Sequence, residues 1–260
     1  MLKKLLSVLG VYKAYERWLL FQIKNYEKPQ HVAIILDGNR RWANEQEVNP
    51  WLGHEKGAET VEQLLEWCEK LGVKSVTLYA FSTENFRRTH DEVQEIMKIA
   101  EAKFRKLLTD ERVHRNKVHV KVIGRVNLLP ESLQKIVAEV EEATKDYDKE
   151  FLNFAFAYGG RAEIVDAAKV IAEKVKSGEL AVEDVNEATF EKYLYTSHMP
   201  NQEPDLIVRT SGEERMSGFL LWQAAYSELC FLDVYWPDFR LIDLLRAFRT
   251  YQRRKRRFGA

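Results

Sequence analysis

Short apolar runs alternate with longer stretches of helical periodicity along the chain. The short runs predict six strands, at residues 32–36, 76–81, 117–123, 151–158, 205–208 and 230–235. The longer stretches predict helices at residues 57–71 and 92–108, around 133–140, at 161–175 and at 238–252, with a loop at 48–57. Strands that alternate with helices are typical of an α/β domain. We therefore expect a single domain with a mostly parallel central sheet of about six strands, flanked by helices on both faces.

Residues 1–26 form an extension ahead of the domain expected at residues 27–260. Its apolar residues fall at helical spacing between lysines and arginines: Leu5, Leu9, Tyr12, Trp18, Leu19 and Ile23. The apolar stretch is interrupted too early for a signal peptide and is far short of the ~20 residues that span a bilayer. The pattern predicts an amphipathic helical extension, which either lies on a membrane surface or packs on the protein's own body.

The composition bounds the class of protein. At 260 residues and 45% hydrophobic content, the chain is long enough to bury one large core. Its 40 basic and 40 acidic residues cancel, so no overall field favours nucleic acid, and anion binding has to come from local clusters. Cys68 and Cys230 lie in apolar surroundings without the spacing of a zinc site or a disulfide framework. We expect two buried, reduced thiols and a cytoplasmic protein.

The segment around Asp37 joins the end of a predicted strand to groups that bind anions. Asp37 follows the first apolar run, and Gly38 and Asn39 favour a turn. Arg40 and Arg41 then supply two guanidinium groups, and a helix start offers unpaired backbone N–H groups to a phosphate. A single carboxylate beside that phosphate suits Mg²⁺. The alternative is an ordinary turn, with the aspartate as a helix cap and both arginines in water.

Polar residues also follow the second predicted strand, in the sequence STENFRR at 82–88. The carboxyl ends of parallel strands share one edge of the sheet, where ligands bind in such folds. The loop expected at 48–57 carries His54 toward the next helix. A turn with a helix cap and a structural histidine is the alternative, but two polar clusters after two strands favour a binding site.

A third polar cluster follows the fifth predicted strand. Residues 209–217 contain Arg209, Arg215 and three hydroxyl groups beside Gly212. Guanidinium groups bind phosphate oxygens in pairs and hydroxyls complete the shell, so a second phosphate site, and thus two phosphorylated substrates, are indicated. A solvated surface loop is the alternative. The chain contains no Walker-type sequence, dinucleotide fingerprint, nucleophile elbow or DDxxD sequence.

In order and spacing, these clusters closely resemble the motifs of the cis-prenyltransferases, the family of undecaprenyl diphosphate synthase and the dehydrodolichyl diphosphate synthases. The resemblance covers residues 31–259. The matching motifs are DGNRRWA at 37–43, GH at 53–54, YAFSTENFRR at 79–88, AYGGR at 157–161, RTSGEERMSGFLLWQAAYSE at 209–228 and RFG at 257–259. The NRR form and Phe86 resemble the archaeal and eukaryotic members more than the bacterial ones.

The resemblance implies a transferase that condenses isopentenyl diphosphate units onto an allylic diphosphate primer such as farnesyl diphosphate. The product would be a long-chain Z-polyprenyl diphosphate, a lipid-carrier precursor. The resemblance implies Mg²⁺ as cofactor, with Asp37 and Glu228 at the metal site, and catalytic roles for Asp37, Asn39 and Asn85. The allylic diphosphate is expected over residues 38–41.

Isopentenyl diphosphate is expected, by the same resemblance, against Arg209, Arg215 and Ser217. The other substrate-binding residues implied by the motifs are Gly38, Arg40, Arg41, Trp42, His54, Ser82, Glu84, Phe86 and Arg88. One family feature is missing, because bacterial members commonly carry a basic residue shortly before the GH pair, where this chain has Asn49, Pro50 and Trp51. Arg40 is the expected substitute.

The family also implies a hydrophobic tunnel for the growing chain, walled by the helix at 92–108. The apolar stripe of that helix has the same periodicity as an ordinary core stripe, so the sequence supports both interpretations.

Five basic residues at 253–257 precede Phe258 and Gly259, and such a run is normally a solvated tail. Arg257 and Gly259 nevertheless match the family's terminal RxG motif, which by resemblance reaches across a dimer interface to the partner's isopentenyl diphosphate site. We therefore expect a self-sufficient homodimer that associates peripherally with a membrane surface for product release. A non-catalytic partner subunit of the same fold is the alternative, but such subunits lose catalytic residues that this chain retains.

Overall fold

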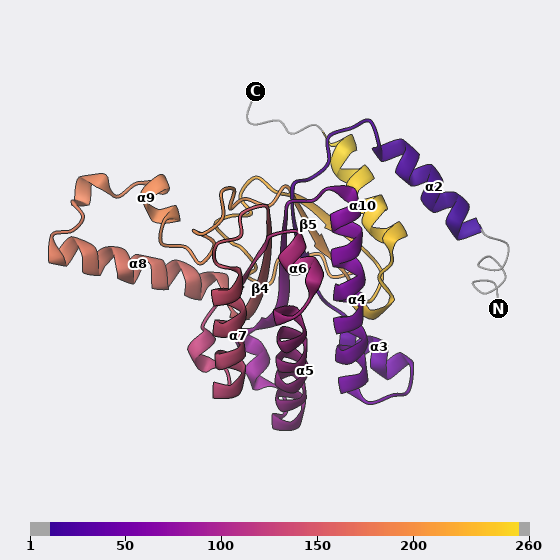
Figure 1. Cartoon of the computed structure of the whole chain (residues 1–260), viewed down its shortest axis with the longest axis horizontal. Coiled ribbons are helices and arrows are strands. Elements are labelled where there is room, and N and C mark those ends of the chain that lie inside the picture. The colour runs from indigo at the N-terminus through magenta and orange to yellow at the C-terminus, as the bar shows by residue number, and fades with distance from the viewer. Residues whose placement is uncertain (1–10, 255–260) are drawn as a thin grey trace.

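Six parallel strands form the centre of the structure, a computed structural model that describes residues 11–254 (Figure 1). In chain order these strands are β1 (His31–Ile35), β2 (Ser75–Ser82), β3 (Val118–Ile123), β4 (Glu150–Tyr158), β5 (Leu206–Arg209) and β6 (Glu228–Phe231). Their order in the sheet is β3-β4-β2-β1-β5-β6, and every neighbouring pair is parallel. The expected α/β fold is confirmed, with a sheet that is entirely parallel.

Helices connect most of the strands and lie before β1 and after β6. They are α2 (Val11–Ile23), α3 (Asn39–Glu45), α4 (Pro50–Leu71), α5 (His90–Leu108), α6 (Glu111–Arg115), α7 (Glu131–Thr144), α8 (Gly160–Ser177), α9 (Glu187–Glu191) and α10 (Leu241–Arg253). Two short 3₁₀ turns matter for the site: η1 (Thr83–Arg87) directly follows β2, and η4 (Trp236–Asp238) precedes α10.

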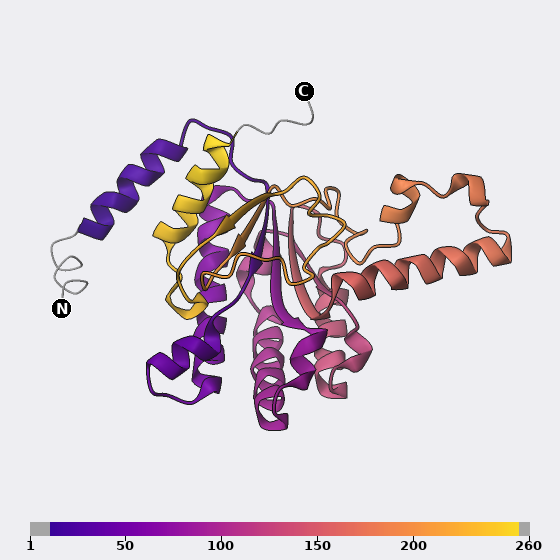
Figure 2. The same cartoon turned by 180° about the vertical axis from the view of Figure 1, so that it is seen from behind.

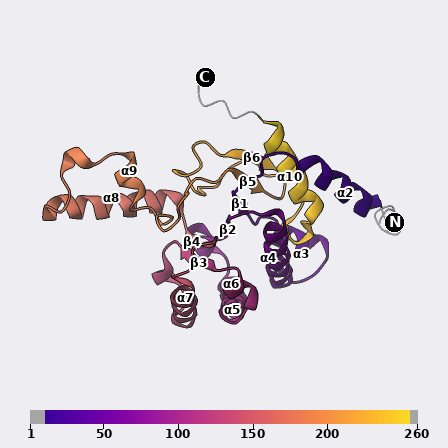
Figure 3. The ribbon, with the colours of Figure 1, turned by 45° about the horizontal axis from the view of Figure 1, so that its top comes forward.

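The two faces of the sheet are covered differently. On one face, strand residues such as Val32, Ile34 and Leu78 pack with α4, α5, α7 and α10 in the main core (Figure 3). On the other face, Tyr79 stacks on Phe219 with 4.7 Å between the ring centroids. That second face is covered mainly by the non-helical segment 210–227 rather than by the helices expected there. Because both faces of β1 are covered, all five of its residues are buried.

Most element boundaries lie within one or two residues of those expected, and three differences are larger. The loop expected at 48–57 is instead the start of α4, because Pro50 occupies the first turn of the helix, where its missing N–H costs no hydrogen bond. The sixth strand lies at Glu228–Phe231 rather than 230–235, and the chain beyond it turns back, so that the Trp236 amide donates to the Asp37 carbonyl at 3.0 Å. The last helix begins at Leu241 rather than 238, after η4.

α2 packs along α10, the last helix of the described residues (Figure 1). Its Leu19 and Ile23 are buried in the main core. Guanidinium groups lie over aromatic rings along this interface, in the pairs Arg240–Tyr12, Arg246–Tyr15 and Arg249–Trp18. This part of the extension therefore packs on the body, the second of the two alternatives, whereas Leu5 and Leu9 lie outside the described residues. Within residues 11–254, no helix is long and apolar enough to cross a membrane.

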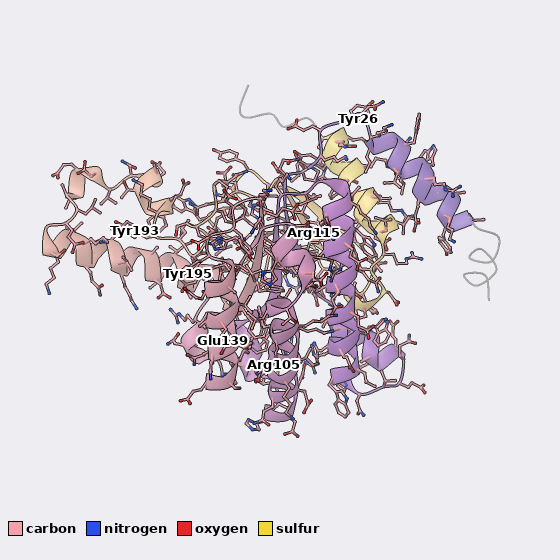
Figure 4. The ribbon with its side chains drawn as sticks, viewed as in Figure 1. Tyr26, Arg105, Arg115, Glu139, Tyr193 and Tyr195 are labelled. Atoms are coloured by element: carbon pink, nitrogen blue, oxygen red, sulfur yellow. The ribbon has the colours of Figure 1, made fainter. Side chains whose placement is uncertain are left out.

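α8 and α9 form an arm that projects from the body (Figure 2). Tyr193 lies between the two helices, and Tyr195 lies where the arm rejoins the body (Figure 4). There the Tyr195 hydroxyl donates to Asp166 Oδ2 at 2.5 Å, and Arg125 donates to both oxygens of the same carboxylate at 2.9 and 3.0 Å. The base of the arm is thus anchored.

Candidate active site

The three polar clusters converge at the carboxyl edge of the sheet, because β2 and β5 lie on either side of β1. In the register of these strands, Ile35 pairs with Tyr79 on one side and with Arg209 on the other. Three residues therefore meet at one edge of the sheet: Asp37 after β1, Ser82 at the end of β2 and Arg209 at the end of β5. At this point of the sheet the chain places β2 on one side of β1 and β5 on the other. That position is the usual ligand site of open parallel sheets.

Asp37 is held between two guanidinium groups. Its Oδ2 accepts a hydrogen bond from Arg209 Nη2 at 2.8 Å, and its Oδ1 accepts one from Arg41 Nη2 at 3.1 Å. The same Arg41 also donates to Ser211 Oγ at 2.7 Å and to Glu213 Oε1 at 3.1 Å. The first and third sequence clusters therefore form one charged network. In it, guanidinium groups that could bind phosphate are paired with carboxylates.

Partial burial of Asp37 would by itself raise the pKa of its carboxyl group. Hydrogen bonds from Arg209 and Ser211, together with the charges of Arg209 and Arg41, outweigh that effect, so the pKa lies below the ordinary value of 3.8. The carboxylate is thus ionised at neutral pH, as a metal ligand has to be.

The segment after β5 is fixed by hydrogen bonds and carries backbone strain. The Thr210 hydroxyl donates to the Asp37 carbonyl at 2.7 Å, and Arg209 Nη1 donates to Ser217 Oγ at 2.8 Å. Ser211 and Ser217 both adopt positive φ values, 79° and 48°, which are unusual for residues other than glycine. Strain of this kind concentrates at binding sites, where the surrounding structure imposes it.

A second charged cluster gathers around Glu92, in the first turn of α5. Its Oε1 lies 3.1 Å from Arg88 Nη1, 3.3 Å from His54 Nε2 and 3.7 Å from Arg40 Nε. The side chain of Glu92 is 9% exposed. Sequence reasoning found the three basic residues but missed Glu92, because acidic residues are common in the first turn of a helix. Burial lowers the pKa of His54, and the neighbouring arginines oppose the rise that Glu92 would cause.

Asn39 lies where α3 and α4 approach most closely. A Cβ at Gly53 would lie 2.2 Å from the Asn39 carbonyl oxygen, and one at Gly57 would lie 2.3 Å from Asn39 Oδ1, so both positions require glycine. The Asn39 Nδ2 donates to the Leu36 carbonyl at 3.1 Å, whereas its Oδ1 is buried without a hydrogen-bond partner among the described residues.

Asn85 has a structural task in this conformation. Its Oδ1 accepts the Ser82 amide at 3.0 Å, and the Ser82 side chain accepts the Asn85 amide, so the two residues cap η1. Phe86 packs edge-on against Phe81, with 4.9 Å between ring centroids. The catalytic role expected for Asn85 stays a prediction, and in this conformation its side-chain oxygen accepts the Ser82 amide.

The remaining residues of the first and second clusters lie around the same edge. Trp42 Nε1 donates to Asp238 Oδ1 at 3.1 Å, and Gly38, with φ 106°, precedes α3. Glu84 lies in η1 and is exposed. Arg215 is largely exposed and pairs with Glu213, which Arg41 also contacts. Glu213 is thus a further acidic residue of the site that sequence reasoning did not assign.

Glu228 does not join Asp37 within one chain. It is the first residue of β6 and pairs in register with Leu206, at the amino end of β5, where it lies 3.0 Å from Arg254 Nη1. Because strands rise about 3.3 Å per residue, it lies far from the carboxyl edge. The expectation that Glu228 shares the Asp37 metal is wrong for a single chain: the motif order is correct, but the strand direction carries Glu228 to the other edge.

The residues present fit a magnesium ion that is bound together with a substrate. Within residues 11–254 no three His, Cys, Asp or Glu side chains cluster as a metal site. Mg²⁺ needs no such cage, because it commonly takes one or two carboxylates and completes its shell with phosphate oxygens and water. Asp37, ionised and surrounded by phosphate-binding groups, has that chemistry. Arg257 and Gly259 lie outside the described residues.

A cavity of about 210 Å³ runs between the sheet, α4 and α5, and its lining includes His54 of the Glu92 cluster. Leu36, Asn39 and His54 line one end. Val73, just before β2, and Val118, the first residue of β3, line the other. Its walls are mainly apolar and include Val61, Leu65, Ile96, Ala100, Phe104 and Leu107. α5, the helix expected to wall a tunnel, contributes the last four. Cys68 also lines the cavity, and both cysteines are free and buried, as expected.

Comparison with known proteins places the chain among enzymes. The family model of undecaprenyl diphosphate synthase matches residues 35–259. The chain is 54% identical to the tritrans,polycis-undecaprenyl-diphosphate synthase (geranylgeranyl-diphosphate specific) of Pyrococcus horikoshii, over 95% of this chain and 93% of that protein. It is also 54% identical to the protein of the same name from Methanocaldococcus jannaschii, over 96% and 89% of the two chains.

Comparison with solved structures also finds diphosphate synthases. Lavandulyl diphosphate synthase from Lavandula x intermedia, in complex with dimethylallyl diphosphate, matches with a TM-score of 0.86 and 38% identity, over 90% of this chain and 99% of that one. A probable undecaprenyl diphosphate synthase from Campylobacter jejuni matches with a TM-score of 0.71 and 30% identity, over 90% and 100%. The chain therefore belongs to the undecaprenyl diphosphate synthase family, the cis-prenyltransferases, and archaeal proteins are among its relatives.

Proposed function

We propose that the protein elongates geranylgeranyl diphosphate with isopentenyl diphosphate units and makes a Z-polyprenyl diphosphate of undecaprenyl length. The observation that carries this proposal is the position of the cavity: an apolar channel begins beside Asn39 and His54, next to two clusters of guanidinium groups. A substrate with a charged diphosphate head and a long hydrocarbon tail matches both surfaces. This primer and this product are more specific than those that the sequence implied, and they follow the names of the archaeal relatives.

The allylic diphosphate is proposed to bind over Gly38 and the first turn of α3, with Arg40, Arg41, His54 and Arg88 around it. From this position its tail would enter the cavity at His54. Isopentenyl diphosphate is proposed against Arg209, Arg215 and Ser217. The buried Arg209 Nε, which has no partner among the described residues, supports this assignment, since a buried donor is costly to leave unpaired.

Substrate binding is proposed to exchange the partners of Asp37. Both of its oxygens now accept hydrogen bonds from guanidinium groups. A diphosphate satisfies those groups at least as well, and so leaves a carboxylate oxygen of Asp37 available for Mg²⁺. The bound ion would stabilise the negative charge that develops on the departing pyrophosphate. Arg41 and Arg88 are positioned to stabilise the same charge more strongly in the transition state than in the ground state.

A non-catalytic subunit of the same fold is the weaker candidate. Such a subunit has no need of an ionised aspartate beside two guanidinium groups, and Asp37, Arg41 and Arg209 form that arrangement here. The apolar cavity next to them would also lack a use.

The active form is proposed to be a homodimer that works at a membrane surface. The projecting α8–α9 arm supports the first part, because α8 leaves Val165 and Val170 exposed on a helix that only its base anchors to the body. The outer side of α2 supports the second part, because it exposes Leu20 and Phe21 together with the basic residues Arg17 and Lys24. In such a dimer, Glu228 and the tail residues Arg257 and Gly259 would serve the partner's site.

The proposed function is tested by incubating the protein with labelled isopentenyl diphosphate, Mg²⁺ and one primer at a time, then sizing the extracted lipid. Geranylgeranyl diphosphate should give the highest kcat/KM and farnesyl diphosphate a lower one. Absence of labelled lipid with every primer would contradict the proposed activity, and a preference for farnesyl diphosphate would contradict the proposed primer alone.

A further inference from the structure

One side of the cavity is closed by charged side chains rather than by apolar packing. On α4, three glutamates recur at helical spacing: Glu62, Glu66 and Glu69. Facing them are Lys103 and Lys106 of α5, Arg112 of α6 and Asn116. All seven side chains line the cavity, and together they are called the ionic seam.

The contacts across the ionic seam are short and follow the carboxyl-terminal part of α4. Glu62 binds Lys103 Nζ at 2.9 Å and Lys106 Nζ at 2.7 Å. Further along, Glu66 lies 2.8 Å from Arg112 Nη1. The last pair is Glu69 with Asn116 Nδ2 at 2.8 Å, and Arg115 lies near it, between α6 and α4 (Figure 4).

The ionic seam differs from the other walls in how easily it can open. The side chains of Glu62 and Lys103 are 32% and 35% exposed, and those of Glu66 and Arg112 are 45% and 38% exposed. Separating such pairs returns both charges to water, so it costs little. The wall formed by the sheet, by contrast, consists of buried residues such as Val76 and Leu152, and moving them would expose the core. The apolar stem of Lys103 can also cover a hydrocarbon while its ammonium group stays in water.

We propose that the ionic seam is the expandable wall of the cavity, and that the Glu62 and Glu66 pairs determine how long the prenyl chain grows before elongation stops. This inference rests on the proposed function. A chain that extends from His54 toward Val118 fills the apolar part of the cavity, and every further unit needs room that only the seam can yield. A weaker seam therefore admits a longer product, and a seam replaced by apolar packing holds the product at or below its normal length.

The test is the size distribution of the labelled lipid. For the double variant Glu62→Ala/Glu66→Ala we expect a shift to products longer by one or more isoprene units. The wild type should show the same direction of shift when KCl is raised from ~0.05 M to ~0.5 M, because salt screens exposed pairs. The double variant, which lacks these pairs, should not respond to salt. Glu179→Ala, which removes the exposed Lys174–Glu179 pair at the end of α8, is the matched control and should leave both length and salt response unchanged.

A sealed variant gives the opposite test. Glu62→Leu/Lys103→Leu replaces one pair by apolar packing and should give products no longer than those of the wild type, with a reduced salt response. If the double alanine variant is poorly folded by circular dichroism, Glu62→Gln, which removes the charge and keeps the volume, takes its place. Unchanged product lengths in the folded variants and across the salt range would overturn the role of the seam. Failure of the wild type to make any labelled lipid would instead overturn the proposed function.

Discussion

Arg209 Nη2 lies 2.8 Å from Asp37 Oδ2, although the two residues are 172 positions apart in the chain. They end neighbouring parallel strands, so the contact follows from the sheet order and not from local sequence. Because Arg41 holds the other carboxylate oxygen, Asp37 stands between the two anion-binding clusters. A substitution that affects one cluster can therefore be distinguished kinetically from one that affects Asp37.

Arg215→Ala should mainly raise the KM for isopentenyl diphosphate, by about 10- to 100-fold, as expected for the loss of a charge-assisted hydrogen bond to phosphate. The KM for the allylic primer should change little, because Arg215 lies in the third cluster and contacts Glu213 rather than the Glu92 group. Steady-state rates with each substrate varied in turn measure both constants. An equal rise in both KM values would contradict the assignment of separate sites.

Glu92→Gln should raise the KM for the allylic primer by about tenfold, because a misplaced cation binds its phosphate less well. The substitution keeps the shape of Glu92 but removes the charge that holds Arg40, His54 and Arg88 together. Glu95→Gln, on the next turn of α5, breaks only an exposed pair with Lys98 and is the control. If both variants behave like the wild type, Glu92 does not position these cations.

His31 makes stability depend on pH. Burial lowers the pKa of this side chain to about 4, from 6.5, and its Nε2 lies 2.8 Å from Thr77 Oγ1. Between these two pH values the unfolded chain takes up a proton that the folded chain does not, so stability falls as pH drops through this window. The loss should approach about 3 kcal/mol of unfolding free energy. Urea unfolding of wild type and His31→Gln across the window measures it, and identical slopes would exclude His31 as a source.

The outer face of α2 can be tested without removing its buried face. Phe21 is 74% exposed, so Phe21→Glu should leave the melting temperature nearly unchanged while weakening co-sedimentation with anionic vesicles. Deletion of residues 1–25 should instead lower the melting temperature by several degrees, because it removes Leu19 and Ile23 from the core. Equal vesicle binding by wild type and Phe21→Glu would contradict a membrane role for this face.

Most of the fold could be predicted from the sequence because its central strands are largely buried. A parallel strand covered on both faces requires a continuous apolar run, and such runs marked β1, β2 and β4. The start of α4 was missed because Pro50 and Gly53 together indicate a loop. Each also suits a helix here, since Pro50 fits the first helical turn and Gly53 allows the close contact with Asn39. The cover of the second face was missed because segment 210–227 has no regular periodicity.

The sequence predicts those parts of the site that follow from the direction of the strands. Residues at or just beyond the carboxyl ends of β1, β2 and β5 had to share an edge, and Asp37, Ser82 and Arg209 do. The separation of Glu228 from Asp37 within one chain was not predicted, because a motif gives no indication of which end of a strand a residue occupies. Glu92 was not found because its three partners come from separate elements, and only the packing of α3, α4 and α5 brings them together.

The most direct test of the central claim, that Asp37 serves the chemical step at the junction of two diphosphate sites, is the rate of labelled isopentenyl diphosphate incorporation by Asp37→Ala at saturating levels of both substrates and Mg²⁺. We expect kcat to fall by about 10²- to 10³-fold or more, with much smaller changes in both KM values, because the lost interactions are strongest in the transition state. A kcat within a fewfold of the wild type would contradict the claim.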